Sequence, residues 1–208
     1  MPVATLVTQV IVDKGDAAFR NPTKPIGPFY SEQKALELEQ KKGWKVALDS
    51  GRGWRRVVPS PVPLRIVEMP MIRSLYESGA IPIVAGGGGI PVVEKVDGSL
   101  SGVEAVIDKD LVSVVLALAL GIETLLVITA VERVALDYGK PTQRWCDRLT
   151  LAEAMRHLAD GQFPPGSMGP KMEAAVWFLK AGGRAVCVTS AAQIRPALQK
   201  RGGTWITA

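Results

Sequence analysis

Ile81-Pro82-Ile83-Val84-Ala85-Gly86-Gly87-Gly88-Gly89-Ile90-Pro91 is the stretch that decides the fold. Its apolar first half is typical of a buried strand, and the four glycines that follow leave the backbone bare. Such a loop lets a ligand approach successive N–H groups, which cradle anions. Ordering each glycine costs roughly 0.5–1 kcal/mol relative to alanine, so the run indicates a close approach. A Lys-Ser/Thr pair does not follow, which excludes a P-loop.

Composition and charge narrow the class of protein. The chain has 208 residues, 47% of them hydrophobic, and a net charge of +5. This mild excess of positive charge fits a solvated surface or an anionic small-molecule ligand. A nucleic-acid partner is not indicated, because the sequence has no dense basic stripe interleaved with aromatic residues. Cys146, Cys187 and the single His157 stand in no metal-ligand spacing, so we predict no protein-held metal. The longest apolar run, Leu111 to Leu120, is too short to span a bilayer, and we expect no membrane association and a cytoplasmic protein.

Apolar β-branched runs alternate with helical patterns along most of the chain. The predicted strands are Ala4–Val12, Ile81–Ala85, Thr124–Thr129, Ala185–Thr189 and Thr204–Thr207. The predicted helices are Glu32–Lys42, Glu68–Ser78, Asp108–Leu120, Thr150–Ala159 (with a capping box from Thr150 and Glu153), Pro170–Ala181 and Ala191–Lys200. This order predicts an α/β fold: an open, mostly parallel sheet with helices on both faces, and ligands at the carboxyl ends of its strands.

Two segments interrupt the alternation. Asn21 to Pro63 is rich in proline, glycine and arginine, and predicts a small protruding lobe or lid, residues 21–63, within one domain of residues 1–208. Its cluster Arg52, Arg55 and Arg56 is more typical of a solvated or salt-bridged surface than of a site. Pro91 to Gly102 predicts a hairpin that turns at Asp97-Gly98.

Three lysines stand where an anion can be held. Lys109 lies between Asp108 and Asp110 at a helix start, where a bound anion would offset the unfavourable macrodipole and Asp110 could fix the lysine. Lys171 follows the glycine-containing entry Gly166 to Pro170 of another helix. Lys24 lies between two prolines that stiffen its loop. A solvated surface lysine is the alternative at each position.

Several stretches together resemble the carbamate kinase family of the amino acid kinase superfamily. They are Thr8–Asp13, Asn21–Tyr30, Gly51–Pro61, Ala85–Val92, Gly102–Leu111, the segment around Thr129–Gln143, and Phe163–Ala174. The resemblance implies a homodimeric enzyme that transfers a phosphoryl group reversibly between ATP and carbamate, giving ADP and carbamoyl phosphate. In arginine fermentation such enzymes usually run toward ATP.

The resemblance also implies roles for single residues. Lys24, Lys109 and Lys171 match the catalytic lysines of the family, Lys109 and Lys171 also on the nucleotide side, and Asp110 matches the aspartate that organises them. The substrate and phosphate floor is implied for Gly86, Gly87, Gly88 and Gly89, and the nucleotide side for Thr129 and Met168. Phosphoryl transfer needs positioning and charge neutralisation, so we expect Mg²⁺ to be held mainly by nucleotide phosphates and water.

One departure keeps two alternatives open. Members of the family begin with a strand, a Gly-Gly-Asn loop and further elements, about a third of the usual chain, which have no counterpart here. The chain is therefore either an ATP-dependent carbamate kinase or a catalytically impaired nucleotide-binding remnant or partner subunit of a split kinase. A relative that acts on another small acid is a third interpretation, disfavoured by the Asn21–Gly27 and Gly51–Pro61 segments.

Overall fold

The computed structural model describes residues 1–49 and 52–208, which form two compact units. The first unit is Met1–Val115 and the second is Leu116–Ala208, so the boundary falls within helix α3 (Lys109–Leu120). None of the helices in these residues combines the length and the apolar character that a membrane crossing requires.

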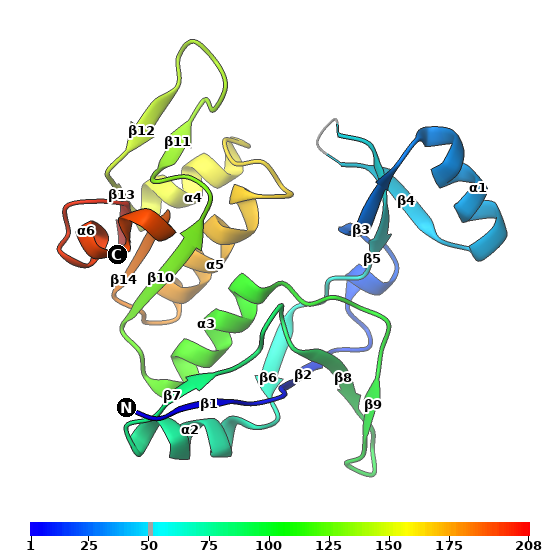
Figure 1. Ribbon diagram of the computed structural model, residues 1–208, viewed down its shortest axis with the longest axis horizontal. Coiled ribbons are helices and arrows are strands. Elements are labelled where there is room, and N and C mark those ends of the chain that lie inside the picture. The colour runs from blue at the N-terminus through cyan, green and yellow to red at the C-terminus, as the bar shows by residue number, and fades with distance from the viewer. Residues whose placement is uncertain (50–51) are drawn as a thin grey trace. The chain divides into compact units, whose positions relative to one another are not determined.

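The first unit begins with two short strands where the sequence predicts one (Figure 1). Strand β1 (Val3–Thr5) pairs in parallel with β7 (Ile81–Ile83), and β2 (Gln9–Val12) belongs to another sheet. The chain changes sheets at Thr8, whose hydroxyl donates to the Leu6 carbonyl and accepts from the Ala85 N–H. The single strand Ala4–Val12 is therefore wrong, because a bond to a residue 77 positions away divides it.

The other sheet of this region has four strands in the order β6-β2-β8-β9. The remaining strands are β6 (Pro63–Ile66), β8 (Ile90–Glu94) and β9 (Leu100–Gly102). β2 and β8 are parallel, whereas β8 and β9 form the predicted antiparallel hairpin. Helix α2 (Met69–Glu77) packs against β7 and contributes Ile72, which is fully buried.

The segment that interrupts the alternation forms a three-stranded antiparallel sheet in the order β3-β5-β4. Its elements are η1 (Ala17–Phe19), just before it, and β3 (Lys24–Tyr30), α1 (Glu32–Lys42), β4 (Lys45–Leu48) and β5 (Trp54–Val58). Helix α1 has the predicted bounds: it begins at the side-chain cap of Ser31, and the left-handed Gly43 follows its last residue. It packs on β4 and β5 through Ala35 and Leu38.

The second unit is built on a four-stranded sheet in the order β10-β14-β15-β13. Its strands are β10 (Thr124–Thr129), β13 (Arg148–Thr150), β14 (Ala185–Ser190) and β15 (Thr204–Thr207), and a separate hairpin joins β11 (Val134–Leu136) to β12 (Arg144–Cys146). The helices are α4 (Leu151–Ala159), α5 (Met168–Lys180), η2 (Ala191–Gln193) and α6 (Ile194–Leu198). Helices α4 and α5 pack together and against the sheet over a core that includes Phe178 and Ile206.

The α/β fold class with helices flanking the sheets is confirmed. Parallel pairing joins β1 to β7, β2 to β8, β10 to β14 and β13 to β15. The hairpins, the strands of the lobe, β2 with β6, and β14 with β15 pair antiparallel, and the strands divide into several sheets rather than one. Two helices also differ from expectation: α5 begins at Met168 rather than Pro170, and a 3₁₀ turn precedes the short α6.

Candidate functional site

In the first unit, the glycine run follows β7 and packs against the entry to α3. A Cβ on Gly88 would lie 2.1 Å from the Ile107 carbonyl oxygen, and one on Gly89 would lie 2.5 Å from Cγ2 of Val10. Gly88 and Gly89 also have φ of 135° and 77°, a region that favours glycine. The close approach that the sequence indicates is therefore made, at these two positions, by the protein's own chain.

Gly86 and Gly87 differ, because a Cβ on either would meet nothing within 4 Å. The N–H groups of Gly86, Gly88 and Gly89 donate to the Val84 and Ala85 carbonyls over 2.6–2.8 Å. Within the described part of the chain, Gly87 N–H is the one amide of the four with no such acceptor. A phosphate cradle at this loop therefore has one available donor rather than four.

Asp108 connects the start of α3 to the lobe. Its Oδ1 accepts from the Asp110 N–H over 2.8 Å, and this cap begins the helix. Its Oδ2 accepts from the ammonium of Lys24 on β3. Asp108 is 6% exposed and follows Ile107, the residue against which Gly88 packs. One carboxylate thus brings together the lobe lysine, the glycine loop and the first turn of α3.

The electrostatics of Asp108 favour its charged form. Burial alone would raise the pKa of this carboxyl, but the hydrogen bond and charge of Lys24 oppose it. The Asp110 N–H and the charge of Lys109 act in the same direction, so the pKa lies below its ordinary value. The ion pair with Lys24 therefore persists at neutral pH.

Lys109 and Asp110 occupy the first turn of α3. Lys109 is exposed and Asp110 is half-buried, so the lysine has access to solvent and to any ligand at this helix start. Asp108, the residue before this turn, holds Lys24 of the lobe. Asp108 was not among the predicted site residues, and the signal that could have indicated it is an acid directly before a helix whose first residue is a lysine.

In the second unit, a cavity of about 230 Å³ lies where β10 ends. Thr129 and Met168 both line it, so these two predicted nucleotide residues come together. Aromatic rings form much of the wall, with Tyr138 and Trp145 packed edge to face at 6.5 Å between centroids. The other lining residues are Ala130, Val131, Arg133, Ala135, Phe163, Pro164 and Ser167.

Lys171 lies one turn along α5 from Met168 and is half-buried. Gly169 allows this helix start to pack closely, since its N–H donates to the Pro164 carbonyl and a Cβ would lie 3.0 Å from that oxygen. Ser167 occupies the cap position without a side-chain cap bond. The structure thus places the predicted lysine on the helix that closes the cavity.

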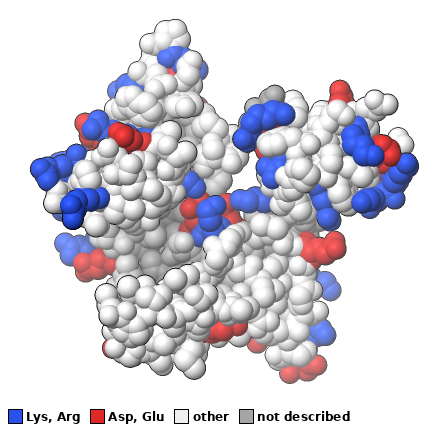
Figure 2. All heavy atoms as spheres, viewed as in Figure 1, with Lys and Arg blue, Asp and Glu red and all other residues white. Residues whose placement is uncertain are grey.

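The positive charge of the chain is concentrated on the lobe. Residues 21–63 contain eight lysines and arginines against four acids, which accounts for most of the net charge of +5. Figure 2 shows blue spheres spread over the α1 lobe. Arg55 pairs with Asp49 over 2.9 Å and lies over the Phe29 ring, as predicted for a salt-bridged surface. Gly51, at the start of one resembling stretch, lies outside the described residues.

Comparison with known proteins decides the family. The amino acid kinase family matches residues 5–190. The chain belongs to this family.

Two curated relatives within the amino acid kinase family are named carbamate kinase. The chain is 49% identical over 205 residues to the carbamate kinase of Thermococcus kodakarensis, covering 99% of this chain and 65% of that protein. It is also 49% identical to the carbamate kinase of Staphylococcus haemolyticus, over 98% of this chain and 66% of that protein. The chain thus spans about two thirds of the length of these curated relatives.

Solved structures agree with this comparison. The Giardia lamblia carbamate kinase bound to citric acid is 42% identical, with a TM-score of 0.91 over 99% of this chain and 64% of that one. The same enzyme bound to AMP-PNP gives a TM-score of 0.86 at 42% identity, over 99% and 65% of the two chains. The fold of an amino acid kinase is therefore present over nearly the whole chain.

Aromatic residues that the sequence analysis did not single out form part of the wall of the 230 Å³ cavity. Tyr138, Trp145 and Phe163 line the cavity but were not predicted to do so. Tyr138 and Trp145 belong to the hairpin that follows β10, and this placement could have indicated them. Across residues 1–49 and 52–208, no three histidine, cysteine or acidic side chains gather as a metal site.

Proposed function

We propose that this chain carries the nucleotide side and the acceptor lobe of a carbamate kinase, which transfers a phosphoryl group reversibly between ATP and carbamate. The observation that carries the proposal is the contact of Lys24 with Asp108, next to Lys109 and the glycine run. It places a lysine of the lobe at the helix start that bears a second predicted catalytic lysine. The names of the relatives support the same reaction.

The chemistry needs charge neutralisation rather than a covalent intermediate. The transferring group spreads negative charge over its equatorial oxygens, and ammonium groups in fixed positions stabilise it. Lys109 and Lys171 are proposed to hold the phosphoryl oxygens, with Lys24 on the acceptor side and Asp110 orienting the lysines. Carbamate is already anionic, so the attacking oxygen needs no base. The Gly87 N–H is the backbone donor proposed for the phosphate floor.

The nucleotide is proposed to bind at the aromatic cavity of the second unit. Its volume of about 230 Å³ is below the roughly 300–1,000 Å³ of whole-ligand pockets, so it suits one part of a nucleotide, the base. Tyr138 and Trp145 supply flat apolar surface for stacking, and Thr129 and Met168 complete the wall. The Giardia lamblia relative solved with AMP-PNP supports an adenine nucleotide.

Further properties follow from the same proposal. Mg²⁺ would bridge the nucleotide phosphates and help to neutralise their charge. Homodimer formation, a cytoplasmic location and a place in arginine metabolism remain predictions of the family resemblance.

A coupled luciferase assay tests the proposal on the purified chain. ADP, carbamoyl phosphate and Mg²⁺ should yield ATP, and Lys171→Ala should lower kcat by about 10²–10³. Lys180→Ala, at the exposed far end of the same helix, should leave the rate unchanged. ATP formation without carbamoyl phosphate dependence, or wild-type rates in Lys171→Ala, would overturn the assignment.

The second candidate is a nucleotide-binding remnant or partner subunit, favoured by the coverage of only 65% of the relatives' length. Retained AMP-PNP binding with no turnover would support it. Lys24→Ala adds a finer distinction, because an acceptor-side lysine should affect kcat and the KM for carbamoyl phosphate rather than nucleotide affinity. A large loss of nucleotide affinity at unchanged kcat would contradict that role.

A further inference from the structure

The second unit contains another, larger cavity, of about 520 Å³, within the range of small-molecule sites. Its charged lining consists of Arg148, Arg184, Lys200 and Glu123, and Trp205 forms its aromatic surface. Thr124, Ala185 and Thr207 complete it. None of these residues belongs to the proposed nucleotide cavity.

Strand register shows that the floor of this cavity is one face of the four-stranded sheet. Arg148 pairs with Trp205, Thr207 with Ala185, and Ala185 with Thr124, so these residues project to the same side. The opposite face carries Leu149, Val186 and Ile206, all buried. The cavity face lies open: Arg148, Thr207 and Thr124 are exposed, and Trp205 is half-buried.

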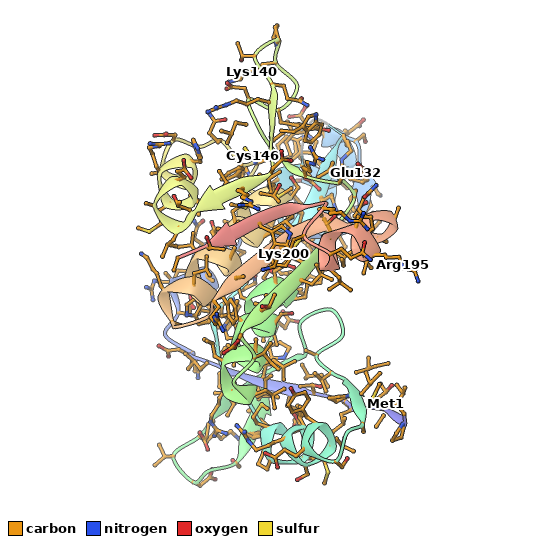
Figure 3. The ribbon with its side chains drawn as sticks, turned by 90° about the vertical axis from the view of Figure 1, so that its left-hand side faces the viewer. Met1, Glu132, Lys140, Cys146, Arg195 and Lys200 are labelled. Atoms are coloured by element: carbon orange, nitrogen blue, oxygen red, sulfur yellow. The ribbon has the colours of Figure 1, made fainter. Side chains whose placement is uncertain are left out.

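The 520 Å³ cavity and the proposed nucleotide cavity lie at opposite ends of strand β10. Thr124 begins β10 and Thr129 ends it, and five residues of extended strand span about 17 Å. Figure 3 shows Lys200 in front of this sheet and Arg195 beyond it, on α6. A ligand here would therefore not touch the reacting phosphoryl group.

The charges at the cavity are unbalanced. Arg184 is paired with Glu123 over 3.0 Å. In the part of the chain that the structure describes, no carboxylate pairs with Arg148 or Lys200. The Lys200 ammonium lies 5.8 Å from the centroid of the Trp205 ring, and its backbone takes the left-handed φ of 59°. Two cations thus flank one aromatic ring without a compensating acid.

Trp205 provides a second, independent sign of a missing partner. Its Nε1 is buried and has no acceptor among the described residues. An unpaired buried N–H costs about 1–3 kcal/mol, so a ligand oxygen that displaces the atoms covering Nε1 and accepts from it would be stabilising.

We propose that this cavity is a second ligand site, which takes a small organic molecule with a flat portion and at least two carboxylate or phosphate groups. The flat portion packs on Trp205, and the anionic groups engage Arg148 and Lys200. The site is separate from the proposed kinase reaction and does not depend on it. Because it shares β10 with the nucleotide cavity, its ligand is suited to a regulatory rather than a substrate role.

Calorimetry at low salt with benzene-1,3-dicarboxylate as the probe tests this site. The probe should bind saturably at one site, and benzoate, with one charge, should bind about tenfold more weakly or worse. Arg148→Ala and Lys200→Ala should each weaken binding by about tenfold, whereas Arg195→Ala should change it by less than about twofold. All three side chains are exposed, so the fold should survive each change.

One competition experiment and one NMR titration complete the test. AMP-PNP should not displace the probe, and the Trp205 indole N–H resonance should shift on titration. Absence of saturable binding, equal losses in all three variants, or displacement by AMP-PNP would overturn the proposal. Tighter binding of a single-stranded oligonucleotide to the same residues would also overturn it, in favour of a nucleic-acid surface.

Discussion

Replacement of Gly88 by alanine tests the central packing contact of the glycine run. The new Cβ would lie 2.1 Å from the Ile107 carbonyl oxygen, and the φ of 135° is unfavourable for any L side chain. Backbone strain costs about 1–3 kcal/mol and overpacking a similar amount. Since the opposing atom is backbone, rotation of a side chain cannot relieve the overlap. We expect a loss of about 3 kcal/mol or more in the free energy of unfolding.

Thermal unfolding followed by circular dichroism measures this loss. At about 2–4 °C per kcal/mol, a loss of 3 kcal/mol lowers Tm by about 6–12 °C. Gly87→Ala is the matched control, because its Cβ meets nothing within 4 Å and its φ is not positive. That variant should stay within about 0.5 kcal/mol of the wild type. A Gly88→Ala protein that melts like Gly87→Ala would refute the packing argument.

Three further predictions concern charge, thiol reactivity and a helix cap. Asp108→Asn keeps the cap but removes the charge facing Lys24, and should cost about 1–2 kcal/mol at pH 7, since the lysine is partly exposed. Because the pKa of Asp108 is lowered from 3.8, the wild-type advantage should be full above pH 3.8 and vanish as the pH falls through the folded value; an advantage independent of pH in urea titrations would refute it. Cys187 is fully buried and burial raises its pKa to about 11, so Ellman's reagent at pH 8 should label it far more slowly than in urea; rapid labelling of the native protein would contradict this. Thr150→Ala breaks the capping box with Glu153 and should cost about 1 kcal/mol in urea unfolding, whereas Thr150→Ser should cost little; equal stability of both would count against the cap.

Local features of the fold could be predicted from the sequence because their causes are local. The start of α1 at Ser31 and its end at Gly43 depend on residues within one turn, and the capping box of α4 is contained in four positions. Strand β10 was also predicted at its observed bounds, since it is a single apolar run between polar residues. The residues within such an element are enough to predict it.

Features that depend on distant partners could not be read in this way. The break between β1 and β2 depends on the hydrogen bond that the Ala85 N–H donates to Thr8. Lys24 pairs with Asp108, which is 84 positions away in the sequence. The sequence indicated that something approaches the glycines closely, but periodicity cannot say that Ile107 does so at Gly88. The aromatic cavity likewise joins a hairpin to the start of α5, two segments with no shared pattern.

A crystal structure of the chain with AMP-PNP and Mg²⁺ tests the account most directly. We predict that the base lies against Tyr138 and Trp145, and that the ammonium groups of Lys109 and Lys171 lie within hydrogen-bonding distance of the γ-phosphate oxygens. A nucleotide bound elsewhere, or a γ-phosphate that neither lysine contacts, would contradict it.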